Sequence, residues 1–175
     1  MVNKWKNVKA LKNTESIKQV EEVWNIKFPE SYINVVLKSN AGVPDPNAFD
    51  TDLSKGKYFA ELLSFNLDAK NSILNEYGLI SNQLPADVFP FAADPGGNYI
   101  CFDYRKDNTK PTVVFWNHEE RFEIEDDQLV NPDVENESEL HVIENVADNF
   151  DKFLEKVYNY SFSFDDDDIE NAVIL

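Results

Sequence analysis

The chain has 175 residues, 42% of them hydrophobic and 13% aromatic, which suits one folded domain and excludes disorder over most of its length. Its formal net charge is −17, and such a chain repels the phosphates of nucleic acids and anionic membrane surfaces. The charge therefore favours a basic protein as the partner, and acidity that serves only solubility is the alternative.

Two helices are predicted near the N-terminus. Apolar residues recur at helical spacing between Thr14, a candidate N-cap, and Asn25, which indicates the first helix. The second helix has Pro29 at its first position, where a missing N–H is tolerated, and Tyr32 on its inner face. Gly42 and the prolines that follow it are stop signals, so the second helix ends before them.

The next part of the chain is predicted to alternate between a loop and short regular elements. Residues 43–57 are expected to form a loop, and residues 58–65 a strand, because the latter are rich in β-prone side chains. A short helix is expected over residues 68–77, ending at Gly78. Phe89-Pro90 is expected to be extended, because a proline restricts the residue before it.

The clearest pattern is a β-hairpin. Residues 98–104 form its first strand, residues 106–110 supply a polar turn, and residues 112–116 form the returning strand. A further short strand is expected at residues 122–124. An exposed acidic loop is expected at residues 126–139, which contain a proline.

A last amphipathic helix is predicted over residues 141–158, because apolar residues recur there at helical spacing. Two helices, a mostly antiparallel sheet and a closing helix indicate an α+β fold, in which helices and strands are segregated along the chain. We expect one domain over residues 1–160, followed by an acidic C-terminal tail over residues 161–175 that contains four consecutive aspartates.

The negative charge is concentrated in the last third of the chain. Residues 1–45 have a net charge of +2 and residues 46–118 a net charge of −3, whereas residues 119–175 carry 19 acidic and 3 basic residues. A localised field steers a partner of opposite sign better than a diffuse field does. This segment is therefore where we look for a partner-binding face.

The single cysteine, Cys101, excludes a disulfide within the chain and favours a reducing compartment. The N-terminal residues are polar and show no signal-peptide pattern, and no apolar run approaches the length of a membrane span. A cytoplasmic location is the expectation from these features.

Several motifs together resemble one family. They are the helix–proline–helix segment 17–42 with Lys-Phe-Pro-Glu-Ser-Tyr at 27–32, the block 89–103 with Asp-Pro-Gly-Gly-Asn at 94–98, the strand Val-Phe-Trp-Asn-His-Glu at 114–119, and the closing segment 146–154. Their order and spacing are similar to those of the SUKH superfamily, which includes yeast cell-wall regulators of the Smi/Knr type and many bacterial immunity proteins. The resemblance covers roughly residues 14–158. It departs from the family at Asn40-Ala41-Gly42, where one residue separates the usual Asn-Gly pair.

The resemblance implies an α+β fold with helices packed on a sheet, and a binding role without catalysis. Bacterial members commonly act as immunity proteins, so it implies a protein that binds and neutralises a cognate toxin, in the expected case a nuclease with a basic active surface. The alternative is an intracellular scaffold or regulatory module with a non-toxin client. A small-molecule-binding or enzymatic domain that uses the turn at Gly96-Gly97 ranks last.

The candidate catalytic and metal sites are weak. Cys101, Asp103 and His118 have the residue types of a nucleophilic triad, but a core role for Cys101 and a structural or surface role for His118 are favoured. His118 and His141 lack the spacing of a zinc site. The Asp94–Asn98 segment lacks the full glycine pattern of a phosphate loop and is interpreted as a tight turn. We therefore predict no catalytic residue, cofactor or metal.

The candidate partner-binding face is the acidic segment around the strand predicted at Phe122. A basic partner would meet its carboxylates, and Trp116 or Phe122 would supply an aromatic anchor. The alternative is a solvated strand edge whose charges prevent aggregation. The candidate residues are Trp116, Glu119, Glu120, Phe122, Glu123, Glu125, Asp126 and Asp127.

Overall fold

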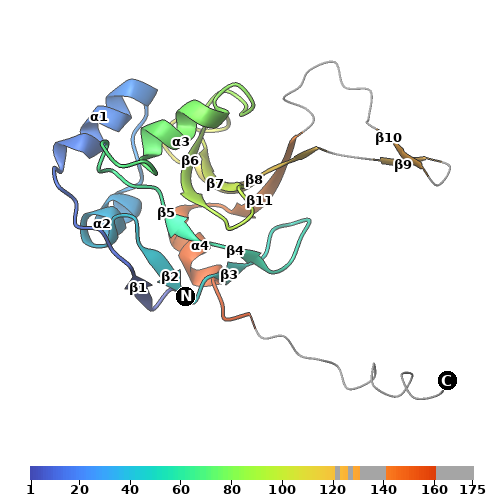
Figure 1. Cartoon of the computed structure of the whole chain (residues 1–175), viewed down its shortest axis with the longest axis horizontal. Coiled ribbons are helices and arrows are strands. Elements are labelled where there is room, and N and C mark those ends of the chain that lie inside the picture. Colours follow the sequence, from blue (N-terminus) through green and yellow to red (C-terminus); the bar gives the residue numbers. More distant parts are fainter. Residues whose placement is uncertain (121–122, 126–127, 131–140, 161–175) are drawn as a thin grey trace.

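An antiparallel five-stranded sheet in the order β11-β8-β7-β6-β5 forms the centre of the domain (Figure 1). The computed structural model describes residues 1–120, 123–125, 128–130 and 141–160, and describes residues 119–120, 123–125, 128–130 and 141–142 by their backbone alone. The strands of the sheet are β5 (Glu61–Leu62), β6 (Val88–Ala93), β7 (Tyr99–Asp103), β8 (Thr112–Glu120) and β11 (His141–Ala147).

The helices and the small strands lie around this sheet. Within the described residues the helices are α1 (Glu15–Trp24), α2 (Glu30–Ser39), α3 (Ile73–Ile80) and α4 (Phe150–Lys156). Three antiparallel two-stranded ladders join β1 (Lys4–Lys6) to β2 (Val43–Asp45), β3 (Ala48–Phe49) to β4 (Lys57–Tyr58), and β9 (Glu123–Glu125) to β10 (Gln128–Val130). The predicted α+β class is confirmed. No helix in the described part of the chain is long and apolar enough to cross a membrane.

The two N-terminal helices follow the sequence prediction closely. Asn25 ends α1 in the left-handed conformation, with φ 53°, and its N–H bonds back to the last turn of the helix. Pro29 is the N-cap of α2 instead of its first helical residue, a shift of one position. Glu21 links the two helices, because its carboxylate accepts a hydrogen bond from the Phe28 N–H at 2.9 Å.

The departure from the family's Asn-Gly pattern at Asn40-Ala41-Gly42 has a structural explanation. Ala41 takes the left-handed conformation, with φ 54°, that carries the chain out of α2. Gly42 is needed for space, because a Cβ atom there would lie 2.7 Å from the Ser39 carbonyl oxygen. The inserted residue therefore makes the turn, while the glycine allows the close approach.

The prediction of a loop at 43–57 followed by one strand at 58–65 is wrong. Residues 43–57 contain β2, β3 and the start of β4, and only Glu61–Leu62 of the later segment joins the central sheet. The reason is that neighbouring N–H groups donate to carbonyls of different segments. Phe59 donates to Asn47, Leu62 to Gly42 and Leu63 to Phe91. No single ladder can form from such divided pairing.

The third helix is displaced from its predicted place. It begins after Ser72, whose hydroxyl accepts a hydrogen bond from the Asn75 N–H, and it continues through Gly78 to Ile80. Gly78 does not stop the helix, because the burial of Ile80 in the core favours one more turn. Tertiary packing thus overrides the local stop signal.

The helix predicted over residues 141–158 is wrong in its first half. Residues 141–147 form β11, which pairs with β8, and the helix α4 starts only at Phe150. Asn149 sets this start, because its side chain accepts a hydrogen bond from the Lys152 N–H at 2.9 Å. Val146, Phe150 and the other predicted inward residues that the structure describes still face the core or pack against it.

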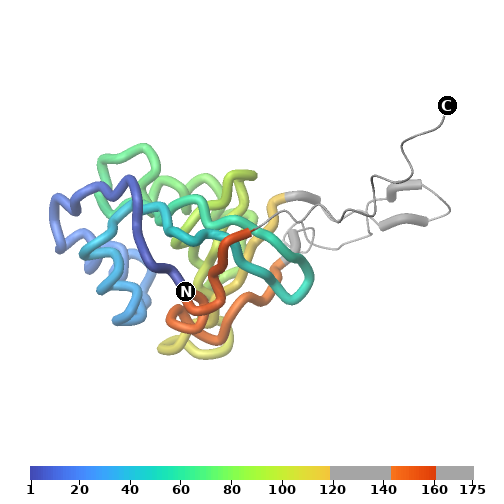
Figure 2. Tube along the Cα trace, turned by 90° about the horizontal axis from the view of Figure 1, so that it is seen from below, coloured from blue at the N-terminus to red at the C-terminus, as the bar shows by residue number. Residues whose placement is uncertain are grey.

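The predicted hairpin is confirmed as β7 and β8, and Phe89-Pro90 lies in the extended strand β6. Beyond the sheet, α2 contacts α4, and α4 contacts β8 and β11. The first residues of the chain lie beside the C-terminal helix, with the Val2 N–H bonded to the Leu154 carbonyl at 3.1 Å (Figure 2). The described C-terminal segment is thereby fixed to the body of the domain.

The core is a cluster of aromatic rings around Tyr32 of α2. Its ring lies 5.5, 5.1 and 5.2 Å from the rings of Phe91, Phe102 and Phe150. Tyr32 is fully buried, and within the described residues its hydroxyl has no hydrogen-bond partner. Burial raises the pKa of Tyr32 well above its usual value.

Tyr32→Phe is expected to increase the free energy of unfolding by about 1 kcal/mol, because it removes an unsatisfied buried polar group and keeps the ring. Urea unfolding followed by fluorescence measures the change. Tyr104→Phe is the control, because the Tyr104 hydroxyl donates to the Lys27 carbonyl at 2.8 Å. In that control the free energy of unfolding is expected to fall by about 1 kcal/mol. Equal losses in both variants would contradict the expectation.

Candidate protein-binding site

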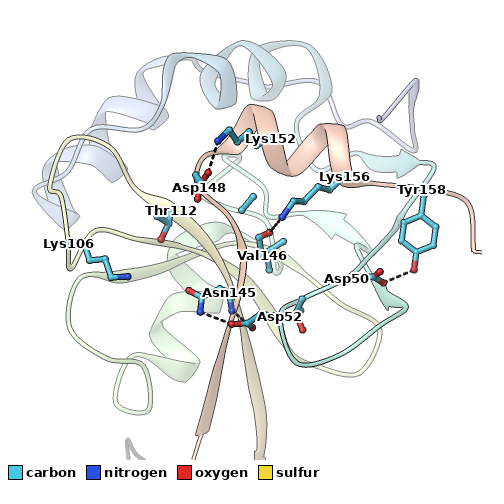
Figure 3. Close-up of a pocket in the computed structure, with 12 residues that line it drawn as sticks. Asp50, Asp52, Lys106, Thr112, Asn145, Val146, Asp148, Lys152, Lys156 and Tyr158 are labelled. Carbon is cyan, nitrogen blue, oxygen red and sulfur yellow. Dashed lines mark hydrogen bonds and ion pairs between the residues drawn. The ribbon is translucent and has the colours of Figure 1, made fainter.

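A polar cleft of about 820 Å³ lies between the β3–β4 loop, the end of β11 and α4 (Figure 3). The loop brings Asp50 and Asp52 to the cleft, β11 brings Asn145, and α4 brings Lys152 and Lys156. The cleft therefore gathers carboxylates and ammonium groups from segments that are far apart in the sequence.

The loop is held in shape by a hydrogen bond within it and by one from Tyr158 of the C-terminal segment. One carboxylate oxygen of Asp50 accepts from the Tyr158 hydroxyl at 2.7 Å and from the Gly56 N–H at 2.9 Å. The bond from Tyr158, followed by that from Gly56, lowers the pKa of Asp50. Gly56 has φ 67°, a conformation that glycine adopts at little cost. The loop therefore presents Asp50 as a fixed, charged group.

Asp52 joins the same loop to the outer edge of β11. Its carboxylate accepts from the Asn145 N–H at 2.7 Å and from the Asn145 side-chain amide at 2.8 Å, and its own N–H bonds to the Asn145 carbonyl at 2.9 Å. Beside it, the Thr51 hydroxyl donates to Glu144, which is buried. These bonds cover the sheet edge at this point, which blunts it against pairing with another chain.

The cations of the cleft are engaged as well. Lys152 of α4 pairs at 2.5 Å with Asp148, which lies just before the helix, and the Lys156 ammonium donates to the Val146 carbonyl at 2.5 Å. The exposed ion pair contributes little to stability. The cleft is thus lined by carboxylate, amide and ammonium groups, several of which are hydrogen-bonded within the domain.

The sequence-predicted anchor Trp116 requires a correction. Its side chain is only 1% exposed and packs near Tyr99, with ring centroids 6.0 Å apart. Trp116 lies in the middle of the sheet, where it pairs with Tyr99 on one side and Ile143 on the other. It is therefore a core residue and does not serve as a surface anchor.

The acidic residues of the predicted face remain a prediction. Glu119 and Glu120 lie at the end of β8, and Glu123 and Glu125 lie in β9, all described by backbone alone. The remaining members of the set lie outside the described residues: Phe122, Asp126 and Asp127.

The residues considered for catalysis have other roles. Cys101 is fully buried, and burial raises the pKa of its thiol well above the usual value. His118 is exposed, with Nδ1 2.6 Å from the side-chain oxygen of Asn98, and Asp103 forms an ion pair with Arg105 at 2.7 Å. The core role predicted for Cys101 and the surface role predicted for His118 are both confirmed.

The interpretation of residues 94–98 as a tight turn is also confirmed. The Asp94 carboxylate accepts from the Gly96 and Asn98 N–H groups at 2.8 and 2.7 Å, and Gly97 has φ 86°. The side chain of Asp94 thus occupies the backbone donors that a phosphate would need. Among the residues whose side chains are described, no group of three or more His, Cys, Asp or Glu residues is placed to hold a metal.

The contribution of the β3–β4 loop to the cleft was not predicted, because residues 43–57 were expected to form only a loop. A signal was present in the run from Asp50 to Gly56, which is rich in residues that form side-chain turns. The Thr51 hydroxyl indeed accepts a hydrogen bond from the Ser54 N–H at 2.8 Å.

A central antiparallel sheet with two helices before it and one after it, and with a polar cleft at its edge, defines a small α+β domain. The profile of a family described as SMI1-KNR4 cell-wall (SUKH_6) matches residues 14–154. The chain therefore belongs to the SMI1-KNR4 family of the SUKH superfamily, as the motifs indicated. This family is consistent with a function of the immunity or Smi/Knr regulatory type. A search among curated proteins gave no match.

Proposed function

We propose that the chain is an immunity protein that binds and neutralises a cognate toxin domain, in the expected case a nuclease, by occluding its basic active surface. The observation that carries this proposal is the concentration of 19 acidic residues, against 3 basic ones, in residues 119–175. The SUKH family membership supports the same conclusion.

The physical argument rests on charge complementarity. A nuclease grips phosphates with lysine and arginine side chains, so its active surface is basic. A localised acidic segment attracts that surface over a distance set by ionic strength and suppresses partners of like charge. The protein acts in this proposal by binding and not by catalysis, and it needs no cofactor or metal to do so.

Co-expression tests the proposal directly. The immunity function predicts a neighbouring gene for a toxin, and co-expression of this chain is expected to rescue cells from the growth arrest which that toxin causes. The rival function, a regulatory module of the Smi/Knr type with a non-toxin client, fits the same family but predicts no such neighbour. Growth arrest that persists in the presence of this chain would overturn the immunity proposal.

Association is expected to depend strongly on salt. Between about 50 and 500 mM salt we expect the association rate constant to fall roughly 10- to 100-fold, while dissociation changes much less. Reversal of Glu123 and Glu125 to Lys is expected to slow association similarly at low salt. The same charge change at Glu22 and Glu30, exposed on the N-terminal helices, is the control and is expected to have a smaller effect. Stopped-flow or surface kinetics measure these rates, and equal effects would exclude the β9 segment as the binding face.

A further inference from the structure

Three exposed hydrophobic side chains lie on the β3–β4 hairpin and on the segment that pairs with β3 at Tyr158. Leu53 in the loop is 63% exposed, Tyr58 on β4 is 37% exposed, and Tyr160 is 43% exposed. The rings of Tyr58 and Tyr160 pack edge to face with centroids 6.0 Å apart. In Figures 1 and 2 the segment leading to Tyr160 runs beside this hairpin.

The backbone holds this group in place. Residues 158–160 are tied to β3, because the Ala48 and Tyr158 N–H groups exchange hydrogen bonds with each other's carbonyls at 3.0 and 2.8 Å. The Tyr160 ring lies directly over Gly56, where an added Cβ atom would approach the ring to 2.7 Å. A surface that is already ordered loses less conformational entropy when a partner binds.

From this arrangement we propose that Leu53, Tyr58 and Tyr160 form the apolar anchor of the partner-binding face, called here the hairpin patch, and that it docks a basic protein. This inference rests on the proposed function, because it names the surface that meets the toxin. Tyrosine is enriched among residues that dominate binding energy, since it supplies a large rigid contact with few rotatable bonds. The hairpin patch provides the exposed aromatic anchor that the buried Trp116 cannot.

Charge complementarity selects a basic partner. Asp50 and Asp52 lie in the same loop, and the 15 residues that follow Tyr160 contain five acidic residues and no basic one. The hairpin also contains two lysines, the exposed Lys55 and Lys57, whose ammonium lies 5.0 Å from the centroid of the Phe115 ring and keeps its charge. The excess of negative charge therefore comes from residues 161–175. The apolar anchor is therefore flanked in sequence by an excess of negative charge, and the partner best suited to it carries basic side chains around an apolar pocket.

The test uses the full chain and, as probe, the purified and catalytically inactivated domain of the toxin encoded beside its gene. We expect Tyr58→Ala and Tyr160→Ala each to weaken binding at least tenfold, and Leu53→Ser about three- to tenfold. Leu79→Ser is the matched control, because Leu79 is 70% exposed on α3, and we expect its affinity to stay within twofold of the original chain. Melting temperatures confirm that each variant is folded.

The possible outcomes separate this inference from the proposed function. If the unaltered chain fails to bind the toxin domain, both are overturned. If it binds and all hairpin-patch variants stay within twofold, only the patch is overturned and the immunity function stands. A concentration-dependent dimer that Leu53→Ser abolishes and Leu79→Ser retains would assign the patch to a second copy. Tighter toxin binding when Phe162 and Phe164 are replaced by Ser would assign it to the chain's own C-terminal segment, and either result overturns the proposal.

Discussion

Phe102→Ala is expected to lower the free energy of unfolding by about 3–5 kcal/mol, one of the largest effects available in this fold. Phe102 is fully buried on β7 and stacks on Phe91 of β6 with ring centroids 4.3 Å apart. It also meets Tyr32 of α2 and Phe150 of α4 at 5.1 and 6.0 Å. Its removal leaves a cavity where the central sheet, an N-terminal helix and the C-terminal helix come together.

Urea unfolding, followed by fluorescence and by circular dichroism, measures this loss. Leu79→Ala is the control, because Leu79 is exposed on α3, and a change within about 0.5 kcal/mol is expected there. A loss below about 1 kcal/mol for Phe102→Ala would mean that the surrounding rings close the cavity, contrary to the tight packing of protein interiors.

The parts of the fold that local chemistry decides could be predicted from the sequence. Asn25 ends a helix in the left-handed conformation, Gly97 turns the chain into β7, and the polar turn after β7 returns it as β8. Each of these depends on residues within a few positions of one another. The α+β class follows from the order of such elements.

The prediction failed where distant pairing decides between two patterns that the sequence satisfies equally. Val146, Phe150 and Phe153 suit one face of a single helix, yet Val146 belongs to a strand, since residues 141–147 complete the hydrogen bonds of β8. Likewise, the bonds between Asp52 and Asn145 join residues 93 positions apart. No local periodicity reveals a contact of that kind.

The candidate site divides in the same way. The excess of acidic residues after residue 118 could be found from the sequence, because it depends only on the number of charged residues. The hairpin patch could not be predicted, because Tyr58 and Tyr160 lie in short segments with no periodicity that separates a buried face from an exposed one. Trp116 is in the core while Tyr160 is exposed, and the difference arises from the neighbours that the fold supplies.

Asn40→Ala is expected to cost about 2–4 kcal/mol, since each buried polar group left without a partner costs about 1–3 kcal/mol. Asn40 is 1% exposed at the end of α2. Its side-chain oxygen accepts from the Phe65 N–H at 2.8 Å, and its amide donates to the Lys9 carbonyl at 3.1 Å. One side chain thus ties α2 to the N-terminal segment and to the chain beyond β5, and alanine would leave partners in both places unsatisfied.

Asn71→Ala is the matched control, because the side-chain amide of Asn71 donates to Glu61 over 3.4 Å in a partly exposed setting. A loss below about 1 kcal/mol is expected there. Hydrogen exchange of the Phe65 amide adds a local reading, since the N–H that Asn40 holds should exchange faster in Asn40→Ala than global unfolding alone explains. Equal losses of stability in both variants, together with a protected Phe65 amide, would contradict this prediction. They would mean that water replaces the bonds of Asn40 and that Ala41 and Gly42 alone hold the end of α2.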